Sequence, residues 1–316
     1  MKPAIALPPT MTVLERGWLS SNSIVFDDGD AMSIVDTGYA SHAEQTFALV
    51  ARLGAANGAE RPLTRIVNTH LHSDHVGGNA LLAARYAASG CTITLPRGLA
   101  AAVAAWDEDA LTYAPTGQRC DRFMYDALIG DGDVLVLGGL RWEVLAAPGH
   151  DPHMVMLFER SHGLLISADA LWEHGFGAIF PEIEGESGFA EQRAALALIE
   201  QHAPRVVIPG HGAPFTDVAT ALTCAHARLD ALSSDPARNA RQVARVLIKF
   251  WLLDRRRVSL DELVDHFARA RYLTLINERY FRQPFDQFIR RTVTELAAAG
   301  ALIVVDGEVR NVDAPS

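Results

Sequence analysis

A short segment of the chain concentrates histidine and aspartate in the pattern H-x-H-x-D-H, formed by His70, His72, Asp74 and His75. It follows a β-branched run that predicts a strand, and residues two apart on an extended chain point to the same side. His70 and His72 can therefore chelate one metal ion. Asp74 and His75 fall in the turn before the next predicted helix and can face a second ion. Such a dense pattern indicates a metal site rather than chance.

Three further ligand-type side chains come directly after predicted strands. They are His150 in Ala-Pro-Gly-His, Asp169 in Ser-Ala-Asp, and His211 in Pro-Gly-His-Gly. The end of a rigid strand is a place where side chains can be held in a preorganised site. We therefore predict one centre that combines these three residues with the H-x-H-x-D-H segment.

Ligation by imidazole nitrogens and carboxylate oxygens suits zinc, with iron or manganese as alternatives. A water shared by two such cations loses a proton near neutral pH and becomes a nucleophile without help from serine or cysteine. Asp74 is the predicted catalytic residue, because it can reach both the second ion and that oxygen and can carry a proton. The sequence contains neither a G-x-S-x-G elbow nor a phosphate-binding P-loop motif.

In its order H-x-H-x-D-H, His150, Asp169, His211, the chain resembles the metallo-β-lactamase superfamily over residues 12–230, and within it the glyoxalase II-like branch. The resemblance implies an α/β fold, a four-layer αββα sandwich with two metal ions in a cleft at one sheet edge. It implies that the first ion is held by His70, His72 and His150, the second by Asp74, His75 and His211, and that Asp169 bridges them. It further implies that Asp36, in Val-Asp-Thr-Gly, braces the ligand loop from behind.

One departure concerns the third ligand. Family members often carry His-x-x-Gly-His, whereas this chain has His150-Asp-Pro-His153. We take His150 as the ligand and expect His153 behind the ligands or in the core, with Asp151 available to brace the site.

Substrate-contacting groups are expected from loops beside the ligands. In the aromatic and glycine-rich stretch 171–180, Trp172, His174 and Phe176 are the candidates for lining a pocket, and a packed connector is the alternative. The aromatic residues of segment 97–131 predict either a lid or ordinary core.

The elements around these residues form two groups of strands, each followed by helices, which favours a layered α/β sandwich. A hairpin is expected at 23–35, a helix that begins with a capping box at Ser41–Glu44, and helices at 189–202 and 217–232.

After Ser233-Ser-Asp-Pro236 the sequence changes to a helical pattern that ends in a two-residue-turn hairpin. We predict a catalytic domain at 1–233 and a small, mostly helical, winged-helix-like domain at 234–316. Arg238, Arg241, Arg245 and Lys249 form one helix face. This face is either exposed to solvent, a binding surface for an anionic substrate, or a contact for nucleic acid. The C-terminal domain as a whole can equally close the cleft or form a homodimer.

Composition narrows the function classes. The 316 residues are 49% hydrophobic, enough to bury roughly three quarters of the chain's surface. The net charge is −10, and its acidic excess lies within residues 1–233, which argues against nucleic-acid binding.

No apolar run reaches membrane-span length, and the proline-broken start does not resemble a secretory signal, so we expect a cytoplasmic protein. The three cysteines are scattered and are expected to be inert thiols.

These patterns favour a dinuclear, zinc-dependent hydrolase that cleaves a carboxylic ester, a thioester or a lactone of a small molecule. A mononuclear iron persulfide dioxygenase is one alternative, and a metal-containing binding or signalling protein that has lost turnover is another.

Overall fold

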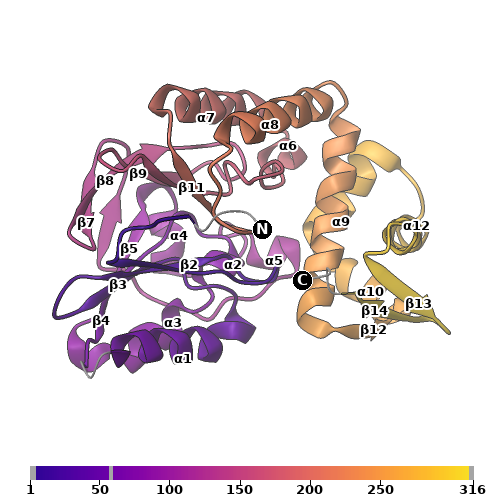
Figure 1. Cartoon of the computed structure of the whole chain (residues 1–316). Helices are drawn as coiled ribbons and strands as arrows, with labels where there is room; N and C mark the ends of the chain where they lie inside the picture. Colours follow the sequence, from indigo (N-terminus) through magenta and orange to yellow (C-terminus); the bar gives the residue numbers. More distant parts are fainter. Residues whose placement is uncertain (1–4, 57–59, 313–316) are drawn as a thin grey trace.

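Two β-sheets pack face to face, and helices cover both outer faces, so the fold is the expected four-layer αββα sandwich (Figure 1). The computed structural model describes residues 5–56 and 60–312. The first sheet runs in the order β1-β2-β3-β4-β5-β6, with β1 (Met11–Leu14), β2 (Ser23–Asp27), β3 (Met32–Val35), β4 (Leu63–Val67), β5 (Thr92–Pro96) and β6 (Ala127–Ile129). The second runs in the order β11-β10-β9-β8-β7, with β7 (Val134–Leu137), β8 (Leu140–Ala146), β9 (Val155–Glu159), β10 (Leu164–Ala168) and β11 (Val206–Pro209).

The strands alternate between two cores because successive side chains point to opposite faces of a sheet. In β2, Ile24 and Phe26 pack between the sheets, whereas Val25 packs toward the helices. In β10, Ile166 packs between the sheets and Leu165 faces the helices on the other side. Both faces are covered, which explains why such strands are continuous apolar runs rather than alternating patterns.

The outer layers are formed by α1 (Ala43–Gly54) and α3 (Asn79–Arg85) on the first sheet, and by α7 (Phe189–His202) and α8 (Val218–Ser233) on the second. Shorter helices lie in the connections: α2 (Ser73–Val76), α4 (Ala100–Ala105), α5 (Tyr113–Thr116) and α6 (Pro181–Glu184). The expected capping box at Ser41 is wrong. Ser41 lies in a 3-10 turn, and α1 begins at Ala43 without a side-chain cap.

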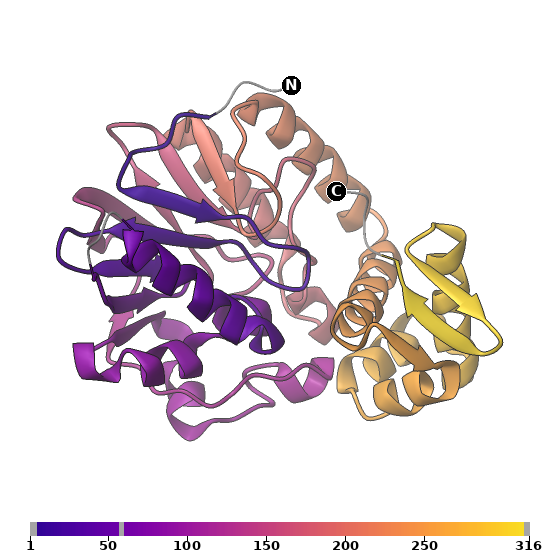
Figure 2. The same ribbon diagram turned by 60° about the horizontal axis from the view of Figure 1, so that its bottom comes forward.

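The C-terminal region consists of a long helix, shorter helices and a small antiparallel sheet (Figure 2). Its elements are α9 (Pro236–Arg255), β12 (Arg257–Ser259), α10 (Leu260–Phe267), α11 (Arg271–Ile276), α12 (Phe285–Ala298), β13 (Leu302–Val305) and β14 (Glu308–Asn311), with the sheet order β12-β14-β13. The hairpin turn places Asp306 and Gly307 at positive φ, as a two-residue type I′ turn requires. The domain boundary at 233/234 stays a prediction.

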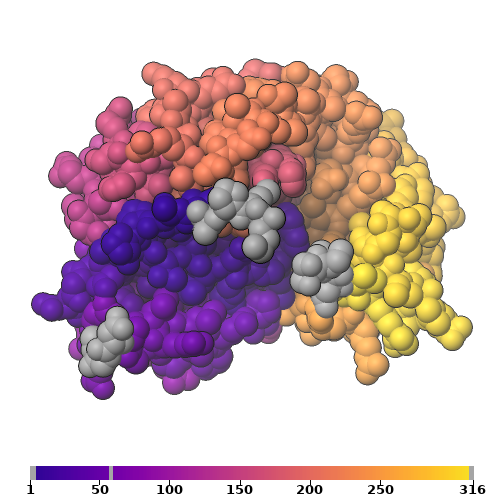
Figure 3. Space-filling model, in the orientation of Figure 1, coloured from indigo at the N-terminus to yellow at the C-terminus, as the bar shows by residue number. Residues whose placement is uncertain are grey.

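This region packs against the sandwich through the segment that follows β10. The Asn239 amide donates to the carbonyl of Ile179, the Tyr272 hydroxyl donates to Glu184, and Arg279 donates to the carbonyl of Ile183. In the space-filling view the region forms one flank of the molecule (Figure 3). Within the described ranges, none of the helices combines the length and apolar character needed to span a bilayer.

Candidate metal centre

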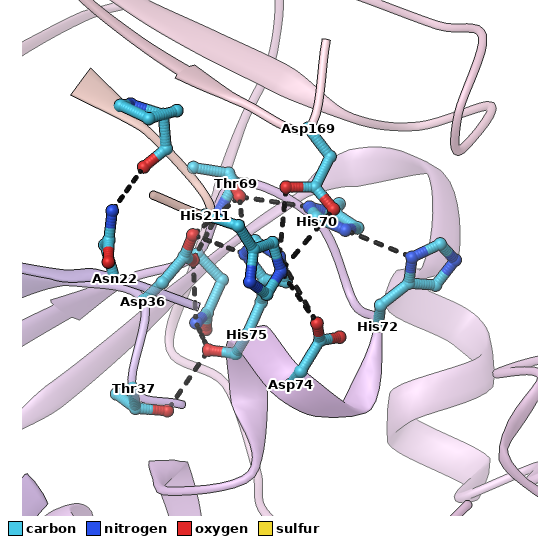
Figure 4. A network of polar contacts seen from close by, with 12 residues as sticks. Asn22, Asp36, Thr37, Thr69, His70, His72, Asp74, His75, Asp169 and His211 are labelled. Carbon is cyan, nitrogen blue, oxygen red and sulfur yellow. Dashed lines mark hydrogen bonds and ion pairs between the residues drawn. The ribbon is translucent and has the colours of Figure 1, made fainter. Parts of the chain in front are cut away.

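Strand ends and one short helix bring the seven predicted ligands into one cluster. Figure 4 shows His70, His72, Asp74, His75, Asp169 and His211 of this cluster. His70 and His72 lie in the loop after β4, and Asp74 and His75 lie on α2. The others follow β8, β10 and β11: His150, Asp169 and His211. The structure thus assembles residues that are far apart in the sequence at one edge of the two sheets.

Three imidazoles, those of His70, His72 and His150, form the first ligand group. Nδ1 of His72 lies 3.2 Å from Nε2 of His70 and 2.8 Å from Nε2 of His150. Nδ1 of His150 lies 2.5 Å from the carbonyl oxygen of Ala178, which can only accept, so in the neutral ring the Nε2 lone pair faces the other two rings. Three converging ring nitrogens fit a cation that takes their lone pairs.

The second ligand group consists of Asp74, His75 and His211. Oδ2 of Asp74 lies 3.1 Å from Nε2 of His211 and 4.0 Å from Nε2 of His75. Nε2 of His75 is buried and has no hydrogen-bond partner in the described part of the chain. Buried polar atoms are normally paired, so an unpaired nitrogen that faces two carboxylates fits a metal ligand.

Asp169 lies between the two groups. Its Oδ2 is 3.4 Å from Nε2 of His150, and its Oδ1 is 3.6 Å from Nε2 of His75. The preceding Ala168 has φ +47°, an uncommon backbone conformation for a residue with a Cβ. Gly210 leaves space for the carboxylate, since a Cβ there would lie 2.2 Å from Oδ1. The backbone around Asp169 thus holds it where one carboxylate can bridge two ions.

Asp36 lies behind the ligands, as the resemblance implies. Its Oδ2 accepts a 2.7 Å hydrogen bond from Nδ1 of His75, and its Oδ1 accepts one of 2.9 Å from the backbone amide of Thr69. Asp36 thereby connects both halves of the ligand loop. Fixing the outer nitrogen of a histidine in this way directs its other nitrogen to the metal.

The electrostatics of the cluster favour bound cations. Burial lowers the pKa of His70 well below its ordinary value and that of His150 to about 4, so both rings are neutral and able to ligate. Burial alone lowers the pKa of His75, but the carboxylates of Asp36, Asp169 and Asp74 outweigh it and raise that pKa well above 6.5. Carboxylates crowded around one imidazole therefore require positive charge, which a metal ion supplies in place of the proton.

A cavity of about 380 Å³ opens onto the cluster. The predicted pocket residues Trp172, His174 and Phe176 all line it, together with several residues that the sequence pattern did not indicate. These include Trp18, which is 52% exposed and stacks on His211 at 5.4 Å, as well as Phe180, Arg228, Gln242, Val246 and Phe250. Because α9 supplies Gln242, Val246 and Phe250, the C-terminal region forms one wall of the cavity.

Several expectations need correction. His153 is neither core nor behind the ligands, because it is exposed and packs on Gly98. Asp151, by contrast, is buried with its Oδ2 3.7 Å from Nε2 of His72. In segment 97–131, Tyr113 and Phe123 are buried in the core, so for these two residues the core alternative is confirmed and the lid is not.

The basic face of α9 is solvated in part, because Arg238 is exposed, whereas its other three basic side chains have partners within the C-terminal region. Arg245 pairs with Glu295 at 2.7 Å, and Lys249 donates to the carbonyl of Ala301. Arg241 lies over the ring of Phe281, 5.3 Å from its centroid. These side chains hold the C-terminal region together instead of facing the cavity.

Comparison with known proteins agrees with this geometry. A family model described as the metallo-beta-lactamase superfamily matches residues 16–211, a range that contains Asp36 and all seven clustered ligands. A hydroxyacylglutathione hydrolase from Nitrobacter winogradskyi is 33% identical over 119 residues, which are 37% of this chain and 38% of that protein. An acyl-coenzyme A thioesterase from Gallus gallus is 27% identical over 158 residues, 48% of this chain and 57% of that protein.

A solved structure extends the likeness to the C-terminal region. A metallo-beta-lactamase family protein from Thermus thermophilus has a similar fold, with a TM-score of 0.56 at 18% identity, over 97% of this chain and 100% of its own. The family match spans more than half of the chain and ends at the last ligand, His211. The chain therefore belongs to the metallo-β-lactamase superfamily.

Proposed function

We propose that the chain is a metal-dependent hydrolase that uses two divalent ions, zinc first among the candidates, to cleave a carboxylic thioester, ester or lactone. The observation that carries the proposal is the convergence of seven nitrogen and oxygen ligands beside a cavity that five of them line: His72, Asp74, His150, Asp169 and His211. His70, His72 and His150 would hold one ion, Asp74, His75 and His211 the other, and Asp169 would bridge them. Bound together, such ions activate water near neutral pH and polarise a carbonyl.

Asp74 is the residue placed to work on the reacting atoms. It lines the cavity with its side chain 15% exposed, whereas the neighbouring His75 is fully buried. Its Oδ2 lies 3.1 Å from Nε2 of His211, so both atoms face the position proposed for the second ion. Asp74 therefore orients the attacking water and carries its proton toward the leaving group.

The aromatic walls bind the substrate and exclude bulk water. Trp18 and Trp172 meet edge to face at 5.4 Å, and Phe180 lies against His72 and His150. A small molecule fits a cavity of this size and character. Two relatives carry the names hydroxyacylglutathione hydrolase and acyl-coenzyme A thioesterase, so thioesters are the first class to test. A homodimer remains an open prediction.

The test is a panel of thioesters, aryl esters and lactones, assayed with zinc-loaded wild type and Asp74→Asn. We expect turnover of at least one class, and a fall in kcat of about 100-fold or more in the variant. Full activity in Asp74→Asn would refute the assigned role. If the protein binds metal but cleaves no class of substrate, the binding-protein alternative is favoured. If protein that holds one iron consumes oxygen when given a persulfide, the dioxygenase alternative is favoured.

A further inference from the structure

One arginine lines the cavity together with the ligand cluster. Arg228 lies on α8, and its guanidinium lies over the ring of Phe176, 5.1 Å from the centroid. Across the cavity wall, Trp172 and Gly175 close a tight turn in which Gly175 has φ +134°. A Cβ at Gly175 would lie 2.9 Å from Nη1 of Arg228. Gly175 thus suits the turn for two reasons: its φ favours glycine, and the absence of a Cβ leaves space for the side chain of Arg228.

Arg228 has no counter-charge in the part of the chain that the structure describes, where it forms neither a hydrogen bond nor an ion pair. Burial lowers the pKa of Arg228, yet a guanidinium still keeps its proton at neutral pH. Arg193, which faces the same helix, contrasts with it because it pairs with Asp230 at 2.6 Å. Burying part of an unpaired cation costs free energy unless an anion pairs with it.

The acidic groups of the cavity are engaged elsewhere. Asp74 and Asp169 face the imidazoles of the ligand cluster. Glu173 lies 3.9 Å from Nε2 of His174. No carboxylate of the described cavity wall is paired with Arg228, so its donors are available to an anionic group of a ligand.

We propose that Arg228 binds a carboxylate of the substrate, so that the enzyme prefers thioesters or esters that carry one carboxylate away from the scissile carbonyl. This inference rests on the proposed hydrolase function. One guanidinium offers a planar pair of donors that matches a single carboxylate. The cavity lining includes the apolar side chains of Phe176, Val246 and Phe250, which cannot pair with the extra charge of a phosphate.

The test compares two substrates that differ in one group: the phenyl thioester of succinic acid and the same thioester with its free carboxylate converted to a primary amide. For zinc-loaded wild type we expect a kcat/KM ratio of about 10 to 100 in favour of the carboxylate, mainly through KM. Arg228→Gln should bring the ratio close to one, and Arg228→Lys should give an intermediate value. Arg193→Gln is the matched control and should keep the wild-type ratio.

A purely structural role for Arg228 predicts a different pattern, in which both rates fall together and the ratio stays as in wild type. That result would overturn the inference. If Arg228→Gln does not fold, the same result measured for Arg228→Lys alone would also overturn it. If wild type cleaves neither thioester, the panel of esters and lactones still tests the hydrolase proposal, and binding tests Arg228. Calorimetry with 4-phenylbutyrate and its amide on zinc-loaded protein should show a carboxylate preference that Arg228→Gln abolishes. Equal binding by wild type and variant would contradict the proposal.

Discussion

The carboxylate of Asp36 accepts a 2.7 Å hydrogen bond from Nδ1 of His75, a residue 39 positions later in the chain. Both side chains are almost completely buried. The same carboxylate accepts a hydrogen bond from the backbone amide of Thr69. Asp36, which directly follows β3, therefore fixes both the start of the ligand loop at Thr69 and its end at His75. The ligand geometry therefore depends on a residue that itself lies outside the ligand set.

Asp36→Asn should weaken metal binding while leaving the fold intact. A neutral amide accepts more weakly from His75, and loss of such an outer partner typically costs about 10- to 100-fold in metal affinity. Competition with a chromophoric chelator measures this. Asp286→Asn, at an exposed position in the first turn of α12, is the control and should bind as wild type. Unchanged affinity in Asp36→Asn would show that the hydrogen bond does not orient His75.

Trp172→Phe should lower kcat without removing metal. The indole Nε1 of Trp172 donates a 3.1 Å hydrogen bond to Oδ1 of Asp169, which phenylalanine cannot replace although it keeps an aromatic ring in the wall. One such bond to a charged group corresponds to about a tenfold change. Metal analysis and steady-state kinetics on the same sample separate the two effects. Loss of metal in step with kcat would instead make Trp172 a support of the ligand cluster.

Gly210→Ala should disrupt the site through sterics alone. The added Cβ would lie 2.2 Å from Oδ1 of Asp169 and 3.0 Å from Cε1 of His75, so the carboxylate has to move. We expect loss of at least one bound ion per chain and a fall in kcat of about 100-fold, since displacements near 1 Å have such effects. Gly17→Ala, where nothing lies within 4 Å, is the control. A fully loaded and active Gly210→Ala would contradict the described position of Asp169.

Cysteine reactivity tests the packing away from the site. Burial raises the pKa of Cys91 to about 11 and that of Cys120 to about 12, whereas Cys224 is exposed. A raised pKa leaves less thiolate, the reactive form, so at pH 8 iodoacetamide should modify Cys224 first. In Cys224→Ser, modification of Cys91 should accelerate about tenfold per pH unit between pH 8 and 10. Mass spectrometry that finds Cys91 modified as fast as Cys224 at pH 8 would disprove this burial.

The ligand cluster could be predicted from sequence because its signals are local. The H-x-H-x-D-H spacing, and the positions of His150, Asp169 and His211 directly after apolar strands, need no knowledge of distant contacts. The layered fold could be predicted for the same reason, since strands such as β10 are continuous apolar runs between turn residues. The expected and observed bounds of α7 agree.

The cavity wall could not be predicted in the same way. Trp18 lies in a connection between strands and Arg228 on a helix that reads as an ordinary outer layer, and only tertiary packing brings them to the ligands. The basic face of α9 shows the opposite error. Its charges looked available in sequence, but Arg245 finds Glu295 fifty residues later in the chain. Ser41 failed as a cap because the chain there continues from a 3-10 turn into α1.

The most direct test of the central claim is the metal stoichiometry of protein that has been stripped with a chelator, reconstituted with excess zinc and freed of unbound metal. The seven converging side chains predict two zinc ions per chain by elemental analysis, falling to one or fewer in His70→Ala and in His211→Ala. Wild-type protein that retains no zinc, iron or manganese would contradict the claim that these residues form a metal centre.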